Sequence, residues 1–244
     1  HRQMSFAMGR PVVSNQHNLV IVGTGEGNLF GLSSRSGEIV WSKQFPAEFE
    51  SFGTIGALAS GEEVALLSSR DGRFHAVSTE QGKAIWSTEL GSESRAQPAV
   101  LPEGVLVATA QSELVLLNIE DGKRIWSKTR TQPSAMTVLG HSRPLVAGDT
   151  VYLGFADGYV VAYELKTGKQ RWAVPAGLGQ AKFLDIDTDP VLVDGRLIVG
   201  SYATGLIALD PDTGKPLWQQ KASGINRLTS DGDRLFAASG DGLV

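Results

Sequence analysis

Hydrophobic and polar positions alternate in short runs, and the same order of runs recurs from one end of the chain to the other. An apolar run such as Asn18–Gly23 (NLVIVG) is followed by a tight turn, and a second alternating run such as Leu29–Ser33 (LFGLS) is followed by another. Short runs bounded by turn signals predict β-strands. No segment sustains a period of 3.6 residues, so we expect no substantial helix.

Each repeat ends on a tryptophan that stands four residues after a glycine. The chain has five Trp, and successive ones are 45, 40, 46 and 46 residues apart. Repeats of this length predict one supersecondary unit each, and a large ring closing the last strand would fill the space between neighbouring units. The residues predicted to dock the units are Trp41, Trp86, Trp126, Trp172 and Trp218, with Gly37, Gly82, Gly122, Gly168 and Gly214.

A further short run before each apolar stretch gives four antiparallel strands per unit. Such a unit has two faces that it cannot bury alone, and radial stacking of four-stranded sheets is a β-propeller. We therefore predict an all-β chain forming one propeller domain over residues 1–244. The predicted blades are 8–45, 52–90, 95–130, 141–176 and 187–222, with a partial sixth at 225–244.

Composition removes several classes of function. The chain has 244 residues and a formal charge of −4, and its Lys and Arg are scattered, so nucleic acid is not expected as a partner. The absence of Cys excludes disulfides, Cys-ligated zinc and thiol chemistry. The four His fall in different repeats without ligand spacing. We predict no catalytic residue, no metal site and no cofactor.

The residues from Ala208 to Trp218 spell A-x-D-x-x-T-G-x-x-x-W. This pattern resembles the pyrroloquinoline-quinone (PQQ) type of propeller repeat, in which the Trp docks one blade on the next. The motif is specific for the fold and weak for function, because quinone dehydrogenases, sensors and scaffold proteins all use it.

Within that superfamily the order of features is similar to the BamB-like lipoproteins of the outer-membrane β-barrel assembly (BAM) machinery. Two segments between predicted blades carry the likeness, which extends over nearly the whole chain. We call Ala135–Pro144 (AMTVLGHSRP) the first segment and Phe183–Pro190 (FLDIDTDP) the second segment.

The resemblance implies a noncatalytic scaffold that docks onto a POTRA domain of BamA, the barrel-assembly subunit. Apolar contacts would come from Met136 and Val138, and acidic contacts from Asp185 and Asp187. The family's Arg in the first segment aligns with Leu139, which removes one charged contact. Other BAM subunits and unfolded outer-membrane proteins are the further implied partners. The implied location is the periplasmic face of the outer membrane, through a lipid anchor and signal segment absent from this chain.

Other interpretations stay open for both segments and for the function. The apolar side chains of the first segment could tuck back onto their blade. Asp185, Asp187 and Asp189 alternate as calcium ligands do, although Pro190 replaces the sharp-turn Gly, and they could equally cap a turn. A generic interaction or sensor propeller is the main alternative function. A quinone-dependent dehydrogenase fragment is disfavoured, because no Cys pair or axial carboxylate cluster is visible.

The number of repeats departs from the family, whose chains have eight blades. Five full repeats and a partial sixth leave an open edge, so we expect further C-terminal blades outside this chain. The alternative is a six-bladed ring completed by the first seven residues. Deleting a ring that fills the space between blades should destabilise the fold by about 3–5 kcal/mol, for Trp172 and Trp218 alike.

Overall fold

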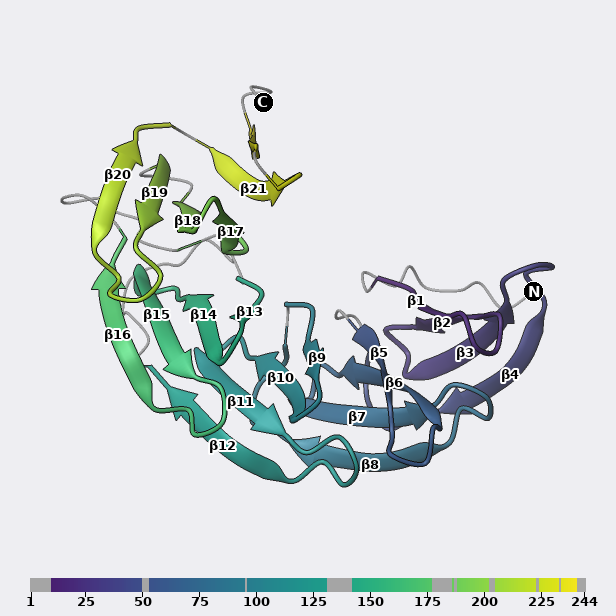
Figure 1. The fold of residues 1–244 in the computed structure, drawn as a ribbon. Helices are drawn as coiled ribbons and strands as arrows, with labels where there is room; N and C mark the ends of the chain where they lie inside the picture. Colours follow the sequence, from purple (N-terminus) through teal and green to yellow (C-terminus); the bar gives the residue numbers. More distant parts are fainter. Residues whose placement is uncertain are drawn as a thin grey trace. The chain divides into compact units, whose positions relative to one another are not determined.

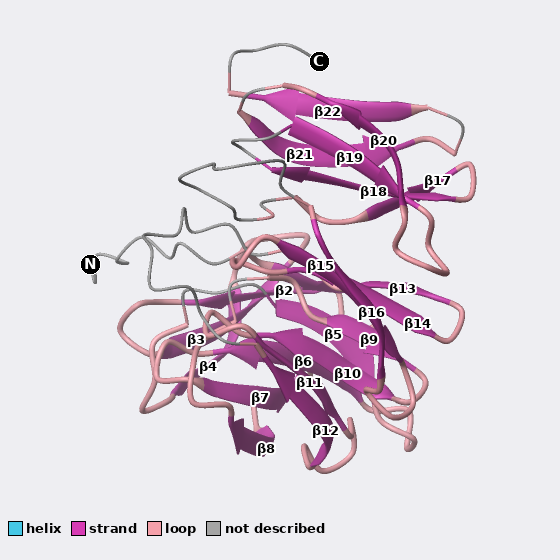
Figure 2. Cartoon of the chain, turned by 90° about the vertical axis from the view of Figure 1, so that its left-hand side faces the viewer, coloured by secondary structure: helices cyan, strands magenta, loops and turns pink. Residues whose placement is uncertain are grey.

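The computed structural model describes residues 10–49, 53–94, 96–130, 142–176, 186, 188–201, 205–222, 224–232 and 234–240. The secondary structure of these residues is entirely β-strand (Figures 1 and 2), which confirms the predicted all-β class. The strands are β1 (Val12–Ser14), β2 (Leu19–Gly23), β3 (Asn28–Ser33), β4 (Ile39–Gln44), β5 (Gly53–Ala57), β6 (Glu63–Ser68), β7 (Arg73–Ser78), β8 (Ala84–Glu89), β9 (Ala99–Leu101), β10 (Gly104–Ala108), β11 (Glu113–Leu117), β12 (Arg124–Thr129), β13 (Leu145–Ala147), β14 (Thr150–Gly154), β15 (Tyr159–Glu164), β16 (Gln170–Pro175), β17 (Val191–Val193), β18 (Arg196–Ser201), β19 (Gly205–Leu209), β20 (Pro216–Gln220), β21 (Ile225–Ser230) and β22 (Leu235–Ser239).

The strands form five four-stranded sheets and one two-stranded sheet, each with its strands in chain order. We call the five sheets blades 1 to 5 and the pair β21–β22 partial blade 6. Neighbouring strands pair antiparallel, for example with Val105 opposite Leu117 in blade 3. The five full repeats and the partial sixth predicted from the Trp spacing are therefore the blades of a partial propeller.

The chain divides into two compact units, residues 1–127 and 128–244. The first contains blades 1 and 2 and most of blade 3, and the second contains blades 4 and 5 and partial blade 6. Strand β12 crosses the boundary. A single domain over residues 1–244 stays a prediction.

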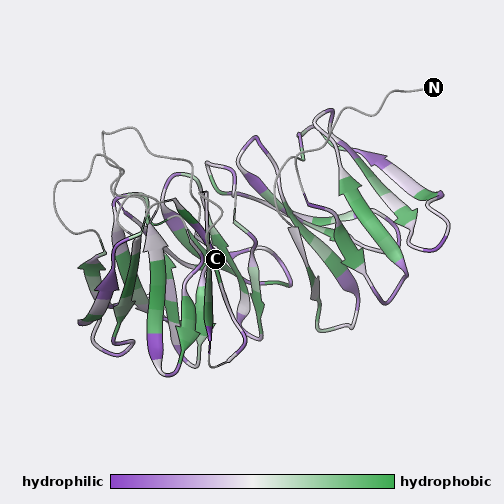
Figure 3. Ribbon diagram, turned by 90° about the horizontal axis from the view of Figure 1, so that it is seen from above, coloured by the Kyte–Doolittle hydropathy of each residue, from purple (hydrophilic) through white to green (hydrophobic). Residues whose placement is uncertain are grey.

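Hydrophobic cores lie between successive blades within each unit. In the first unit Ile21 and Leu29 of blade 1 cluster with Ala65 and Val77 of blade 2. In the second unit Val160 of blade 4 clusters with residues of blade 5 in the same way. Figure 3 shows the hydropathy that produces this arrangement, with hydrophobic strands joined by hydrophilic turns. A four-stranded sheet with two apolar faces must stack on both sides, which is the reason for the repeat.

The turn between the third and fourth strands of each blade requires glycine. In blade 5 the Gly214 N–H donates to the carbonyl oxygen of Asp210 at 2.8 Å, and the Gly214 φ angle is 72°. The Asp210 carboxylate accepts hydrogen bonds from the Thr213 hydroxyl and N–H, both at 2.8 Å, and these bonds lower the pKa of Asp210. The D-x-x-T-G part of the motif is therefore a self-capped turn with one left-handed residue.

The tryptophan that follows the turn packs on the equivalent turn of the next blade. Trp172 is 8% exposed, and a Cβ placed on Gly214 would lie 2.7 Å from its ring. Within the units the structure shows this contact three times, with indole N–H donating to a carbonyl oxygen: Trp41 to Thr79 at 3.0 Å, Trp86 to Ile119 at 2.8 Å and Trp172 to Pro211 at 2.9 Å. The docking of Trp126 and Trp218, and of Gly37 and Gly168, stays a prediction.

The residue across the ladder is small for Trp41, Trp86, Trp172 and Trp218. Ala162 faces Trp172 and Ala208 faces Trp218, and the register shifts immediately after each alanine. A bulge at this point twists the strand locally. The alanine of the sequence motif therefore leaves room for the indole, whereas the glycine receives the indole of the preceding blade.

The cost of replacing a turn glycine with alanine has two sources, the positive φ angle and the contact with the tryptophan ring. Two glycines of the first unit allow these sources to be measured separately. Gly37 has a φ of 73°, and the described residues leave 4 Å of open space around an added Cβ. Gly122 has a φ of 70°, but its Cβ would lie 2.5 Å from the Trp86 ring. We expect Gly37→Ala to lower the free energy of unfolding by about 1 kcal/mol. Gly122→Ala should cost about 1–3 kcal/mol more, because the indole must move. Urea unfolding of both variants measures the difference, and equal losses would contradict the docking role of Gly122.

Candidate partner-docking interface

The residues that the resemblance implies as partner contacts lie outside the described residues. This holds for Met136, Val138 and Leu139 in the first segment and for Asp185 and Asp187 in the second segment. The structure describes the last three residues of the first segment, Ser142–Pro144. In the second segment it describes Ile186 and residues 188–190. The described part of the candidate interface therefore consists of these residues and of the residues of the second unit that contact them.

The described ends of the two segments are joined directly. The Arg143 N–H donates a hydrogen bond of 2.7 Å to the Asp189 carboxylate, across 46 residues of sequence. An ionised acceptor makes this a strong type of hydrogen bond. Asp189, the carboxylate nearest to strand β17, therefore acts as the cap that one interpretation of the acidic run predicted. The hydrogen bond also places the two segments side by side at Arg143 and Asp189.

Each segment is also held to its own blade by a hydroxyl. The Ser142 Oγ accepts a hydrogen bond of 3.3 Å from the Gly154 N–H at the end of β14. In blade 5, the Thr188 Oγ1 accepts one of 2.7 Å from the Gly200 N–H of β18. Both hydroxyl residues are buried, and both precede their glycine by 12 residues. The two blades therefore present the ends of their leading segments in the same local geometry.

Ile186 anchors the second segment at its centre. Its side chain is 1% exposed and lies against Gly154 so closely that a Cβ on this glycine would collide with it. Its N–H donates to the Phe155 carbonyl oxygen at 3.3 Å. Phe49 does the same in the first unit, against Gly23, with its N–H donating to the Thr24 oxygen at 3.1 Å. Sequence reasoning missed this anchor, whose signal was one apolar residue between two aspartates.

Arg130 fixes the chain at the end of β12, five residues before the first segment begins. Its guanidinium makes an ion pair of 2.6 Å and a second hydrogen bond of 2.8 Å with the Asp157 carboxylate. The same guanidinium lies 4.6 Å from the Tyr159 ring centre and 5.5 Å from the Phe155 ring centre. A mostly buried cation–π pair contributes up to about 2 kcal/mol. Sequence reasoning missed Arg130, because its partners follow it by 25 residues or more.

These contacts fix the described residues on either side of Met136, Val138 and Leu139, and the described residues next to Asp185 and Asp187. Among the described residues, no group of three His, Cys, Asp or Glu is arranged to hold a metal ion. The same part of the chain has no helix that could cross a membrane.

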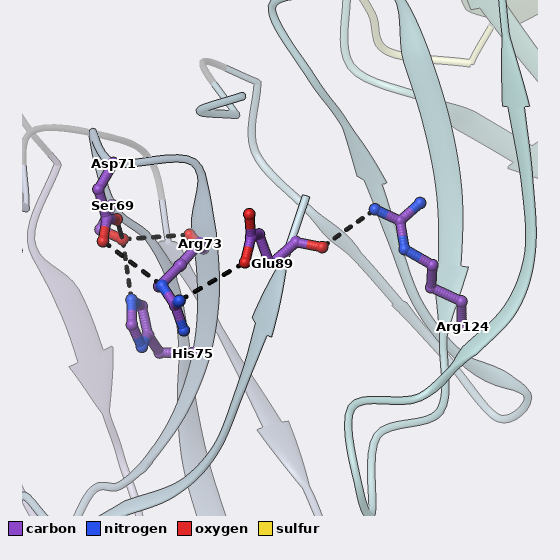
Figure 4. A network of polar contacts seen from close by, with 6 residues as sticks. All are labelled: Ser69, Asp71, Arg73, His75, Glu89 and Arg124. Carbon is purple, nitrogen blue, oxygen red and sulfur yellow. Dashed lines mark hydrogen bonds and ion pairs between the residues drawn. The ribbon is translucent and has the colours of Figure 1, made fainter. Parts of the chain in front are cut away.

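The structure brings one serine, one aspartate and one histidine together in blade 2 (Figure 4). The Ser69 hydroxyl lies 2.5 Å from the Asp71 carboxylate and 2.8 Å from the His75 Nε2. A hydrolytic triad places histidine between serine and aspartate, whereas here serine stands between the other two. Ser69 is also fully buried. The sequence predicted no triad on the His residues, and this geometry is that of a structural network in which Ser69 and His75 are buried and Asp71 is exposed.

His75 is held neutral by its surroundings. Burial against Phe45 and Phe49, whose ring centres lie 6.0 and 5.5 Å from the imidazole, lowers the pKa of His75 to about 4. The neighbouring Asp71 raises this pKa and Arg73 lowers it, both by smaller amounts. Since the short contact to Asp71 uses the Ser69 proton, the neutral ring donates from Nε2 to Ser69.

Comparison with known proteins decides the family. The family described as outer membrane protein assembly factor BamB matches residues 50–244. The chain belongs to the BamB family. The outer membrane protein assembly factor BamB of Shewanella oneidensis is 28% identical over an alignment of 214 residues, and the match covers 82% of this chain and 54% of that protein. The chain thus spans about half the length of the curated BamB relatives that it matches.

Solved structures confirm the propeller fold. The crystal structure of BamB from Moraxella catarrhalis matches with a TM-score of 0.79 at 26% identity, over 98% of this chain and 72% of that chain. A quinohemoprotein alcohol dehydrogenase from Comamonas testosteroni matches with a TM-score of 0.64 at 12% identity, over 98% of this chain and 46% of that chain. At this low identity the second likeness shows the shared fold alone. The resemblance to a BamB-like PQQ-repeat protein is therefore confirmed.

Proposed function

We propose that this chain is part of a noncatalytic scaffold for the assembly of outer-membrane proteins, acting at the periplasmic face of the outer membrane. The observation that carries the proposal is the family match over residues 50–244, supported by relatives named as assembly factors. Its partner within the assembly machinery is a POTRA domain of BamA. Other subunits of the machinery and unfolded outer-membrane proteins are further partners.

The docking surface consists of the first and second segments. Support comes from their described ends, which the Arg143–Asp189 hydrogen bond joins and which Ser142 and Thr188 hold to their blades. In this proposal Met136, Val138 and Leu139 supply the apolar contacts, and Asp185 and Asp187 meet basic groups of the partner. Ile186 and Arg130 are positioning residues that touch the chain and not the partner.

A small apolar patch with flanking carboxylates predicts how binding responds to salt. Charged contacts at the rim of an interface set orientation and association rate more than affinity. Exposed charges are screened over about 8 Å at physiological ionic strength. We expect the affinity for the POTRA domains to fall as salt rises, and the association rate to fall more than the dissociation rate rises.

Calorimetric titration with purified BamA POTRA domains tests the proposal. The test variant combines Asp185→Ala with Asp187→Ala, measured at low and moderate salt. We expect the double variant to bind about tenfold or more weakly, corresponding to at least about 1.4 kcal/mol, and to lose most of the salt dependence. Thermal unfolding of the same variant should be nearly unchanged, because the carboxylates contact the partner.

The matched control is Glu80→Ala with Asp212→Ala, which makes the same change of net charge. Both control residues are exposed and lie outside the second segment, Glu80 in a turn of blade 2 and Asp212 in the β19–β20 turn of blade 5. An equal loss in the control would show that net charge matters and the second segment does not. No binding by the folded wild-type chain would overturn the POTRA proposal, and a large loss of stability in the Asp double variant would favour the structural capping role.

A further inference from the structure

The second unit contains a cavity that the proposed scaffold function does not use. Its volume is about 490 Å³, within the range of small-molecule sites, and it lies between the end of β12 and the β15–β16 hairpin. All of its lining residues belong to residues 128–244. They are Lys128, Thr129, Arg130, Asp157, Tyr163, Gly168, Lys169 and Gln170.

The cavity has a surplus of positive charge. Asp157 is its single carboxylate, and this group is already paired with Arg130 by contacts of 2.6 and 2.8 Å. The two remaining cations are Lys128 and Lys169. Among the described residues neither ammonium group has a carboxylate within ion-pair distance, so the lining carries two positive charges without a counter-charge. Opposite charge should therefore be attracted into the cavity.

Neutral hydrogen-bond donors lie beside these charges. Tyr163 is 3% exposed and lines the cavity, and burial raises the pKa of its phenol, so the hydroxyl stays protonated at neutral pH. No described residue accepts a hydrogen bond from this hydroxyl. The hydroxyl of Thr129 and the amide of Gln170 complete a lining that is rich in donors.

We propose that this cavity binds a phosphate group. A phosphate monoester carries up to two negative charges and three acceptor oxygens, which match two unpaired ammonium groups and the neutral donors around them. A carboxylate has one charge and two oxygens and would leave one lysine without a counter-charge. The Arg130–Asp157 ion pair also lines the cavity. Because its two charges neutralise each other, the pair adds no net charge to the lining.

Titration of the full chain with inorganic phosphate tests the proposal, with binding followed by calorimetry and by the amide NMR signals of the β15–β16 hairpin. We expect saturable binding with a Kd of roughly 1 mM. Lys128→Gln with Lys169→Gln should weaken phosphate binding about tenfold or more, since both charges face the anion. Acetate should bind more weakly than phosphate.

The matched control is Lys166→Gln, an exposed lysine of the same hairpin that does not line the cavity. It should leave phosphate binding unchanged. Equal weakening by the control, or no saturable binding of phosphate by the folded wild-type chain, would overturn the proposal. Both outcomes are independent of POTRA binding, because neither lysine belongs to the two segments.

The source of the phosphate is distinguished by two further ligands. Glycerol phosphate represents a free soluble ester, and vesicles of phosphatidylglycerol present the same group on a lipid surface. Binding of glycerol phosphate with the same dependence on Lys128 and Lys169 assigns a soluble ligand, whereas tighter binding to vesicles with that dependence assigns a lipid headgroup. If vesicles bind the wild type and the double lysine variant equally well, and free phosphate does not bind, the cavity is not the binding site.

Discussion

Replacing Trp172 with alanine is expected to lower the free energy of unfolding by about 3–5 kcal/mol. The indole is 8% exposed, stacks on Gly214 of the next blade and donates to the Pro211 carbonyl oxygen at 2.9 Å. Tyr152 lies beside it, with the ring centres 5.8 Å apart. Truncation removes a large apolar contact, leaves a cavity between blades 4 and 5 and leaves the Pro211 carbonyl without this donor.

Trp218 is the matched comparison for this prediction. The repeat pattern alone predicts the same loss for both tryptophans, but in the structure Trp218 is 40% exposed, and this corrects the expected cost of Trp218→Ala to about 1 kcal/mol. Urea unfolding of the two variants, with Trp172→Phe as a milder truncation, measures the difference. A loss below about 1 kcal/mol for Trp172→Ala would contradict its buried docking role.

Acidification is expected to destabilise the first unit through His75. The pKa of His75 is lowered from 6.5 to about 4 in the folded chain, first by burial. Between these values the unfolded chain binds a proton that the folded chain does not, so the free energy of unfolding falls as the pH falls. The loss is about 1.4 kcal/mol per pH unit and reaches about 3 kcal/mol near pH 4. Above pH 6.5 the contribution is fully present.

The variant His75→Gln isolates this effect from other titrating groups. Glutamine keeps a donor for Ser69 but has no proton to gain, and Asp71, Arg73 and Glu89 remain around it. We expect urea unfolding between pH 7 and pH 4.5 to show a smaller loss of stability in the variant than in the wild type, by about 2 kcal/mol or more. Equal losses would mean that His75 takes up its proton in the folded state near its ordinary pKa.

Local signals were enough to predict the blades. The apolar run Asn18–Gly23 was predicted as a strand and is found as β2 at Leu19–Gly23, because alternation and turn glycines act within a few residues of the chain. Strand β1 shows the limit of such signals: a strand was predicted before this run without bounds, and the structure has it at Val12–Ser14. The ends of a short strand such as β1 are set by its pairing with β2. The alternation of the sequence does not show where that pairing begins.

The sequence by itself determined the repeat, the self-capped turn before Gly214 and the large ring that closes each full blade. All of these depend on contacts inside one repeat or between equivalent positions of successive repeats. The tertiary structure decided what no local pattern encodes: the packing of Ile186 on Gly154, the Arg143–Asp189 hydrogen bond, the buried environment of His75, and the two cavity lysines that have no carboxylate partner among the described residues. These features join residues that are distant in sequence or depend on which side chains neighbouring blades bury. Burial and pairing of this kind exist only after the sheets have stacked.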